Sequence, residues 1–231
     1  MTTNLEHAAS FARDGYLVIE NFFNEDELDL AFKEVLIMAN EAWQLATYPY
    51  KKEDGKYHDG SIHTPIDKQD STETIKRLGE AVEAAKTSTQ MCYAFLRTSN
   101  EEIEKPFRDL MVGKFPLISN IVGEPINSFY AVFTSCYDRG CFLTPHTDDF
   151  KIDSPPTIAF VLNVSRDWRW EWGGILHILD KSPWENGEVI KTIKPTYNSL
   201  VLFRLPKWHY VSEVATCAPG KRLAFSGWLK P

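Results

Sequence analysis

The chain has 231 residues, of which 43% are hydrophobic and 13% aromatic, and its 25 basic and 32 acidic residues leave a net charge of −7. This length and hydrophobic content support a substantial buried core and exclude general disorder. The acidic balance argues against a nucleic acid or an anionic membrane surface as the main partner. No apolar run approaches the roughly 20 residues of a membrane helix, and the N-terminus lacks a secretory signal pattern. We therefore expect a cytoplasmic protein without a membrane partner.

The first third of the chain predicts a strand, a helix and a long loop. Residues 16–20 (YLVIE) are β-prone. Asn24 lies three residues before Glu27, a spacing typical of a capping box, which predicts a helix that continues to about residue 45. Residues 48–74 are polar and aperiodic, with two prolines and two glycines. This composition predicts a surface loop that could act as a lid over a binding site.

Further helices and a set of strands follow. Residues 75–97 and 100–122 are predicted to be mainly helical, the second opened by Ser99 and bent or shortened by Pro106. Beyond residue 126 the sequence predicts short strands at regular spacing. Such strands are typical of a barrel or a double-sheet jelly roll, so we predict an α+β, mainly β fold. The eight predicted strands are β-branched and aromatic, with turn residues between them, and lie at 127–137, 142–147, 157–164, 175–180, 188–193, 199–204, 209–214 and 222–229.

We interpret residues 1–231 as one domain with two parts. Residues 1–126 would supply a strand, supporting helices and the lid loop, and residues 127–231 the β-rich core. Six of the seven tryptophans lie beyond residue 167, in that second part. The four cysteines, Cys136 and Cys141 among them, form no CxxC motif and are expected to be reduced thiols.

The strongest local signal is His146-Thr147-Asp148, the only His-x-Asp sequence in the chain. In an extended segment, residues i and i+2 project to the same face, so an imidazole nitrogen and a carboxylate oxygen can converge on one metal ion. His209 begins another β-prone run and could supply a third ligand from a neighbouring strand. Two imidazoles and one carboxylate are typical of non-haem Fe(II) oxygenases. Alone, the His-x-Asp pair would fit a strand end that meets a turn.

Arg222 lies thirteen residues after His209, at the start of the apolar run RLAFSGWL. An arginine in such a strand is costly to bury unless it is paired, and its planar fork suits a carboxylate. A metal triad beside a buried cation therefore predicts an anionic co-substrate.

The order of these motifs resembles the Fe(II)/2-oxoglutarate-dependent dioxygenases, in particular their prolyl-hydroxylase-like branch. The resemblance covers about residues 127–229, and the segment FARDGYLVIENFFNEDEL resembles the opening strand and helix of that branch. It implies a double-stranded β-helix (jelly roll) with N-terminal supporting helices, in which residues 127–231 form the catalytic core. The motifs that carry it are, in order, HTD, VLNVSRDWRWEWGGIL, NSLVLF, HYVSEV and RLAFSGW.

The resemblance also implies the cofactors and the residues that hold them. Fe(II) would be bound by His146, Asp148 and His209, and Arg222 would bind the distal carboxylate of 2-oxoglutarate. Dioxygen is the second co-substrate. Related halogenases resemble this pattern with a small residue in place of the carboxylate, so Asp148 favours hydroxylation.

Three further residues are candidates for the pocket. Tyr137 resembles a tyrosine whose hydroxyl hydrogen-bonds the co-substrate, and Leu176 would form a wall of the pocket. Trp228 resembles a tryptophan that some prolyl hydroxylases place near the substrate. For Tyr137 and Trp228, packing in a β-core is an equally good interpretation. The chain departs from its oxygen-sensing relatives at Val161, where they carry a second tyrosine, so its pocket would be closed differently.

Other polar residues are weaker candidates. His58 and His63 lie in the polar loop, His177 alternates within a predicted strand, and Asp149 does not share a face with His146. Three arginines could line the mouth of the site, but solvated surface positions are the preferred interpretation for them: Arg139, Arg166 and Arg169.

The implied reaction is the hydroxylation of an unactivated C–H bond, with conversion of 2-oxoglutarate into succinate and CO2. A prolyl residue in a protein or peptide is the leading substrate, because the resembled branch acts on such residues and the 48–74 loop could cover an extended peptide. A free amino acid or a natural-product intermediate is the alternative small-molecule substrate.

Two other classes of protein stay open, a zinc hydrolase built on the same triad and a non-catalytic β-barrel binding module. Against the hydrolase, no glutamate is evidently placed as a general base, and Arg222 would lack a purpose.

Overall fold

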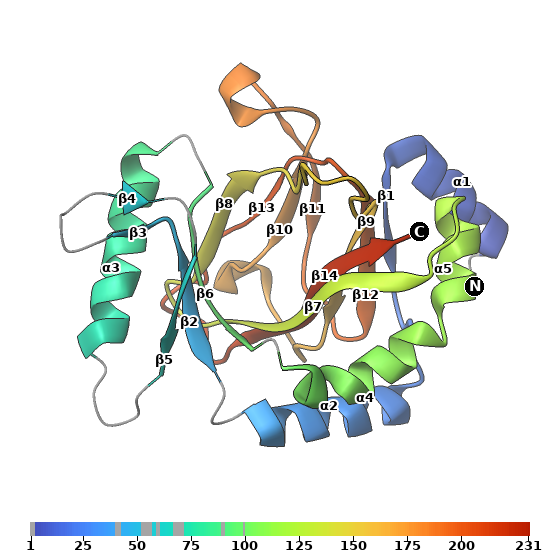
Figure 1. The fold of residues 1–231 in the computed structure, drawn as a ribbon, viewed down its shortest axis with the longest axis horizontal. Helices are drawn as coiled ribbons and strands as arrows, with labels where there is room; N and C mark the ends of the chain where they lie inside the picture. Colours follow the sequence, from blue (N-terminus) through green and yellow to red (C-terminus); the bar gives the residue numbers. More distant parts are fainter. Residues whose placement is uncertain are drawn as a thin grey trace.

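The computed structural model describes residues 3–39, 43–51, 57–58, 61–66, 72–88, 91–98 and 100–231. Within this part, helices surround a curled antiparallel sheet (Figure 1). The helices are α1 (Asn4–Asp14), α2 (Glu25–Ala39), α3 (Thr72–Thr87), α4 (Glu101–Val112) and α5 (Phe115–Val122). The strands are β1 (Tyr16–Ile19), β2 (Gln44–Tyr48), β3 (Tyr50–Lys51), β4 (Tyr57–His58), β5 (Ile62–Pro65), β6 (Tyr93–Thr98), β7 (Ser128–Tyr137), β8 (Phe142–His146), β9 (Ile158–Asn163), β10 (Leu176–Leu179), β11 (Val189–Ile193), β12 (Ser199–Arg204), β13 (His209–Val211) and β14 (Arg222–Lys230).

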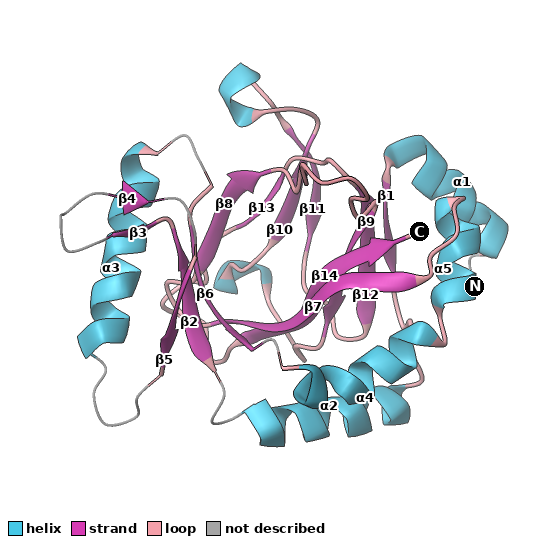
Figure 2. Cartoon of the chain, viewed as in Figure 1, coloured by secondary structure: helices cyan, strands magenta, loops and turns pink. Residues whose placement is uncertain are grey.

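The eight strands β7 to β14 confirm the strands predicted beyond residue 127 and form a double-stranded β-helix (Figure 2). One wall contains β12, β9, β14 and β7 in hydrogen-bonded order, extended at one edge by β1. The other wall contains β8, β13, β10 and β11. This architecture confirms the predicted mainly β jelly roll.

The central strand β9 illustrates why the wall is buried on both sides. Ile158, Phe160 and Leu162 belong to a core cluster shared with helices α4 and α5, whereas Ala159 and Val161 belong to the cluster inside the barrel. Successive side chains of a strand point to opposite faces, so a strand covered on both faces carries apolar residues throughout. The helices therefore exclude water from the outer face of this wall and leave the inner face for the site.

The helix predicted from Asn24 is confirmed, but it is shorter than predicted. The side-chain oxygen of Asn24 accepts hydrogen bonds from the backbone N–H groups of Asp26 and Glu27, as a helix N-cap does. The helix ends at Ala39, and Gln44–Tyr48 form strand β2 instead of a last helical turn. Pairing of β2 with both β5 and β6 outweighs the local helical pattern there.

The helix predicted over residues 75–97 is wrong in its second half. Helix α3 ends at Thr87, and Tyr93–Thr98 form strand β6. This strand pairs with β2, β7 and β8, so its backbone groups are hydrogen-bonded within the sheet. Tertiary pairing again overrides the helix propensity of its alanine, leucine and arginine.

The helix predicted over residues 100–122 is present as two helices. Asn100 caps α4 through its side chain, and the predicted cap Ser99 lies outside the described residues. Pro106 lies within α4, so the chain is not interrupted there. The break falls instead before α5, whose first turn contains Pro116, because proline lacks the N–H that would continue the first helix.

The 48–74 segment is not only a loop. Strands β3 and β4 pair with each other, and β5 adds to the edge of β2. Residues 52–56, 59–60 and 67–71 lie outside the described residues, so the lid role stays a prediction.

The division of the chain at residue 126 also stays an interpretation, and β6 and β2 extend the same sheet as the core. Among the described helices, none has the length and apolar character needed to cross a bilayer.

Candidate metal centre and co-substrate pocket

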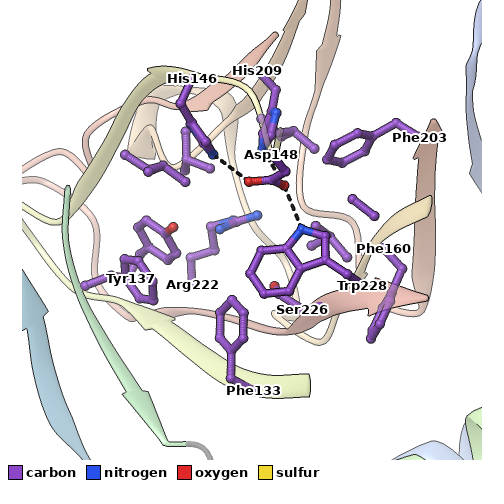
Figure 3. A pocket seen from close by; sticks show the side chains of 17 residues that line it. Phe133, Tyr137, His146, Asp148, Phe160, Phe203, His209, Arg222, Ser226 and Trp228 are labelled. Carbon is purple, nitrogen blue, oxygen red and sulfur yellow. Dashed lines mark hydrogen bonds and ion pairs between the residues drawn. The ribbon is translucent and has the colours of Figure 1, made fainter. Parts of the chain in front are cut away.

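Three predicted ligands converge inside the barrel (Figure 3). His146 ends β8 and lies directly opposite His209, the first residue of β13, so their rings lie 4.2 Å apart between centroids. Asp148 follows His146 by two residues and reaches both imidazoles. Its Oδ1 lies 3.4 Å from Nε2 of His146, and its Oδ2 lies 3.8 Å from Nε2 of His209. One ligand atom from each residue lies within 4.8 Å of the others, as a shared metal ion requires.

Backbone carbonyls fix the orientation of both imidazoles. Nδ1 of His146 donates to the carbonyl of Thr144 at 3.0 Å, and Nδ1 of His209 donates to the carbonyl of Lys207 at 2.8 Å. Because a carbonyl only accepts, these bonds place the proton of each neutral ring on Nδ1 and leave the Nε2 lone pair directed at Asp148. This second layer of hydrogen bonds is usual around metal-binding histidines.

Asp148 is held by a residue from the opposite wall. The indole N–H of Trp228, on β14, donates to Oδ2 of Asp148 at 2.7 Å (Figure 3). Trp228 therefore has a positioning contact that the sequence did not predict. Its predicted role beside the substrate stays a prediction, although its ring lines two cavities described below.

Electrostatics keep His209 and Asp148 in the protonation states that a metal needs. Burial, with a contribution from neighbouring His146, lowers the pKa of His209 to about 4, so this ring is neutral at neutral pH. Burial alone would raise the pKa of Asp148, but its contacts with His146, His209 and Trp228 hold that pKa below its ordinary value. Neutral imidazoles and an ionised carboxylate are the forms that bind metal ions.

Arg222 lies deep in the same barrel. It begins β14 opposite Tyr137 of β7, its residue is 3% exposed, and its guanidinium carbon lies 4.9 Å from the centre of the Tyr137 ring. Its buried Nε has no hydrogen-bond partner, and no carboxylate in the described part of the chain lies within ion-pair distance. Burial lowers the pKa of Arg222, although an arginine remains charged in proteins. An unpaired guanidinium in this position indicates a site for an anion.

Gly174 gives Arg222 its space. This glycine has φ +63°, and a Cβ there would lie 3.0 Å from Cδ of Arg222 and 3.0 Å from Val214. The preceding turn is held by the indole N–H of Trp168, which donates to the carbonyl of Gly173 at 2.8 Å. The glycine pair after the tryptophan-rich turn therefore provides the close approach that an arginine on the inner wall requires.

An inner cavity joins the triad to Arg222. Tyr137, 4% exposed, stacks on Phe95 with ring centres 4.9 Å apart, and burial raises its pKa well above the ordinary value, so it is a neutral phenol. Leu176, the predicted wall residue, and Val161, where the chain departs from its oxygen-sensing relatives, line this cavity from β10 and β9. Its lining residues are mostly apolar: Phe95, Phe133, Tyr137, Leu143, His146, Asp148, Ala159, Phe160, Val161, Leu176, Phe203, His209, Val211, Arg222, Ser226, Gly227 and Trp228.

The weaker candidates lie elsewhere. His177 stacks on Tyr210 at 4.4 Å, and His63 is exposed on β5. Arg166 is not simply solvated, because it pairs with Glu25 and Asp29 and ties the barrel to α2.

The remaining candidates have local partners, are unreactive or have side chains outside the described part of the structure. Arg139 donates to the carbonyl of Ala218, and Arg169 lies beside Glu171. Burial raises the pKa of Cys136 to about 12 and that of Cys141 to about 11, so both are unreactive thiols. Only the backbone of His58, in β4, falls within the described features.

A second, outer cavity of about 320 Å³ shares a wall with the first. One of its charged residues, Arg97, was not among the predicted site residues, because β6 was predicted as helix. The alternation of YAFLRT, in which every second residue is aromatic or charged, was the available signal. The lining residues are Met91, Tyr93, Phe95, Arg97, Phe133, Leu143, His146, Thr147, Asp148, Asp149, Phe150 and Trp228.

Comparisons with known proteins agree with this site. Residues 132–230 match the family model of the 2OG-Fe(II) oxygenase superfamily. A search of curated protein sequences gave no match. The fold is similar to a prolyl-4-hydroxylase of Pseudomonas putida, with a TM-score of 0.61, 17% identity, and coverage of 97% of this chain and 98% of that chain.

Two other solved structures extend the comparison. One is a prolyl hydroxylase of Trichoplax adhaerens in complex with a peptide fragment of hypoxia inducible factor, with a TM-score of 0.59, 15% identity, and coverage of 98% of this chain and 88% of that chain. The other is the α-ketoglutarate-dependent epimerase SnoN of nogalamycin biosynthesis, with a TM-score of 0.60, 11% identity, and coverage of 98% and 80%. The part of the chain that carries the double-stranded β-helix and the convergent triad is therefore similar to the 2OG-Fe(II) oxygenase superfamily.

Proposed function

We propose that this protein is an Fe(II)- and 2-oxoglutarate-dependent oxygenase that hydroxylates an unactivated C–H bond, and that a prolyl residue in a protein or peptide is its leading substrate. The observation that carries the proposal is the buried triad with an unpaired, buried arginine in the same cavity. The superfamily match and this arginine favour an oxygenase over the zinc hydrolase and the non-catalytic module.

The donor set fits Fe(II). His146, Asp148 and His209 would be the ligands, through the two Nε2 atoms and a carboxylate oxygen. Three protein ligands leave coordination positions free for co-substrates, as in other sites with two histidines and one carboxylate.

The inner cavity fits 2-oxoglutarate. Arg222 would pair with the carboxylate of the co-substrate farther from the metal, because its Nε is buried and without a partner. The neutral phenol of Tyr137 faces Arg222 and could donate a hydrogen bond to the same carboxylate. Leu176, 3% exposed, would pack against the methylene groups.

When bound, the metal and the two co-substrates supply a balanced oxidation in which R–H, O2 and 2-oxoglutarate become R–OH, succinate and CO2. The chain's own residues position these reactants and exclude water. Trp228 fixes one carboxylate oxygen of Asp148, and the carbonyls of Thr144 and Lys207 fix the imidazoles. The apolar lining of the inner cavity limits access of bulk solvent.

The substrate would enter from the outer cavity, which meets the triad at His146 and Asp148. Its aromatic walls, Tyr93, Phe133 and Trp228, suit a flat or cyclic apolar group such as a proline ring. The structural likeness to prolyl hydroxylases supports this substrate class, whereas the likeness to an epimerase keeps a small-molecule substrate as the alternative. None of the four cysteines, all of which lie in the described part of the chain, forms a disulfide bond, and this supports the cytoplasmic setting expected from the sequence.

The test is succinate formation by the purified chain with Fe(II), 2-oxoglutarate and O2, against a panel of proline-containing peptides, free amino acids and other small molecules. Mass spectrometry of each candidate should detect one product with one added oxygen. A product of unchanged mass would contradict hydroxylation and indicate epimerisation. Anaerobic addition of 2-oxoglutarate to the Fe(II) protein should produce a visible charge-transfer band, and its absence would contradict the proposed site.

A further inference from the structure

The outer cavity has one basic residue among the described residues that line it, Arg97. This arginine comes from β6, where side chains alternate between two faces. Tyr93, Phe95 and Arg97 line the cavity, whereas Ala94 and Leu96 pack in a separate core cluster with α3. The cavity-facing row is therefore two aromatic rings followed by a guanidinium.

Arg97 has no directly bonded anionic partner in the described part of the chain, although Glu104 of α4 acts on it electrostatically. No ion pair or hydrogen bond is formed by its side chain there, and its buried Nε has no hydrogen-bond partner. Its guanidinium carbon lies 4.4 Å from the centre of the Phe133 ring, so the ring supports one face of the cation and leaves its donors unused. Burial lowers the pKa of Arg97, an effect that Tyr93 and Glu104 offset only in part.

The acidic residues of the outer cavity do not supply that partner. Asp148 is turned toward the two histidines and Trp228. Asp149 is paired with Lys151, and its side chain is 47% exposed. A half-buried cation therefore borders a cavity whose carboxylates are already engaged.

We propose that the outer cavity recognises a substrate carboxylate through Arg97, and that this carboxylate lies on the same residue as the hydroxylated carbon or on its neighbour. This inference rests on the proposed function. Arg97 and the predicted ligands His146 and Asp148 line the same cavity of about 320 Å³, so the anion and the reacting carbon of one bound substrate would lie within it. Phe95, Phe133 and Trp228 pack against the hydrocarbon part between them.

A carboxylate in this position could belong to a free amino acid, to a C-terminal residue or to an acidic side chain beside the hydroxylated residue. These sources share the chemistry that Arg97 reads, a planar anion that accepts two parallel N–H bonds. They differ in whether the reacting residue is joined to further residues, and on which side. Substrates of each kind can therefore be compared directly.

The experiment measures binding of matched acids and amides to the full-length protein by calorimetry, both with Fe(II) and 2-oxoglutarate under nitrogen and without them. The probes are N-acetyl-L-proline and N-acetyl-L-prolinamide, which differ only in charge and hydrogen-bond acceptors. The wild type should bind the acid about tenfold more tightly, because a charge-assisted bidentate pair is formed only with the acid. Arg97→Gln should reduce this preference to near unity and leave the affinity for the amide unchanged.

Arg169→Gln is the matched control, because it removes the same charge from an exposed arginine outside both cavities. Arg97→Lys keeps the charge without the fork and should retain part of the preference, which keeps the test decisive if Arg97→Gln does not fold. Equal affinity for the two probes in the wild type, including no binding of either, would overturn the inference. So would a preference that survives in Arg97→Gln.

Succinate assays then separate the sources of the carboxylate. The paired substrates are L-proline with L-prolinamide, acetyl-Ala-Pro as acid and as amide, and acetyl-Pro-Asp-amide with acetyl-Pro-Asn-amide. At least one acid should exceed its neutral partner about tenfold in kcat/KM, and parity in all three pairs would contradict the proposal. If the wild type decarboxylates no 2-oxoglutarate and lacks the anaerobic band, the proposed function fails, while the calorimetry still decides the role of Arg97.

Discussion

The inner and outer cavities share part of one wall, yet they hold their arginines in different ways. Arg222 is 3% exposed and is confined by Tyr137 on one side and Gly174 on the other. Arg97 is half-buried and has one face covered by Phe133. An enclosed arginine can be paired only by a small ligand that fits the barrel, whereas a half-buried one can meet groups of different size. This difference agrees with the proposal that the inner cavity binds one fixed co-substrate and the outer cavity binds the variable substrate.

The largest expected effect comes from the two histidines of the triad, of which His146 lines both cavities. His146→Ala or His209→Ala should reduce 2-oxoglutarate turnover by more than about 10³-fold, because a metal site with two remaining ligands binds Fe(II) poorly. His177→Ala, which changes a histidine outside both cavities, should keep turnover near the wild-type rate. Succinate release and iron content measure the effect. Turnover at the parent rate in either ligand variant would remove that histidine from the proposed triad.

The second largest effect is expected from removal of Arg222, the cation of the inner cavity. Arg222→Ala is expected to raise the KM for 2-oxoglutarate about 100-fold, since a buried charge-assisted pair is worth about 1.5–3 kcal/mol. Arg139→Ala, which removes an arginine bound to a backbone carbonyl, should leave this KM unchanged.

The same position offers a second measurement on the ligand-free protein. Arg222→Met should raise its midpoint of thermal unfolding, because an unpaired buried charge is replaced by an apolar chain of similar length. A lower midpoint together with an unchanged KM would mean that Arg222 is a structural residue and not a co-substrate ligand.

A smaller effect should follow from the contact that links the walls. Trp228→Phe keeps an aromatic ring but removes the N–H that donates to Asp148 at 2.7 Å. Loss of such an outer contact of a metal ligand typically costs about 10-fold to 100-fold in metal affinity, and we expect the lower end. Trp184→Phe, at an exposed position, is the control. Equal Fe(II) dissociation constants in wild type and Trp228→Phe would show that the hydrogen bond does not support the metal site.

The smallest expected effect concerns Glu104, a fully buried residue of α4 behind the outer cavity. Its Oε1 accepts a hydrogen bond from the backbone N–H of Thr134, and burial raises its pKa to about 7. A carboxyl whose pKa is higher in the folded than in the unfolded state stabilises the fold at low pH, and this contribution is lost as pH rises from about 4.5 through 7.

This pH dependence can be isolated with a neutral variant. Relative to Glu104→Gln, the wild type should lose about 1–3 kcal/mol of unfolding free energy between pH 5 and pH 8, measured by urea denaturation. Taking the difference removes the separate pH dependence of His209, whose lowered pKa acts in the opposite direction at acidic pH. A difference that does not change with pH would contradict the raised pKa of Glu104.

The sequence predicted the inner part of the site much better than the outer part, and the reason is local. The His-x-Asp sequence and the strands around it lie in a β-rich region in which the alternation of apolar residues agrees with the tertiary structure. Strand β6 has the opposite character. Its alanine, leucine and arginine favour a helix locally, and only pairing with β2, β7 and β8 makes it a strand. Arg97 was therefore missed together with its strand.

Contacts across the barrel also could not be predicted from sequence patterns. Trp228 and Asp148 lie 80 positions apart, and their hydrogen bond depends on the register of β14 against β7 and β9. The same holds for Gly174, whose Cβ position approaches Arg222 only after the strands have assembled. Spacing along the chain identified the groups, whereas the sheet register determines which of them meet.

The position of Trp228 has a thermodynamic consequence. Its N–H holds Asp148, while its ring lies 5.3 Å from Phe150 and 5.7 Å from Phe133 between centroids, on the wall of the outer cavity. A molecule in that cavity that shifts the indole must also alter the affinity of the triad for its metal. Linkage is reciprocal, so occupation of the triad must alter the affinity for that molecule by the same factor. The affinities for metal and for substrate at the two proposed sites are thus coupled through one side chain.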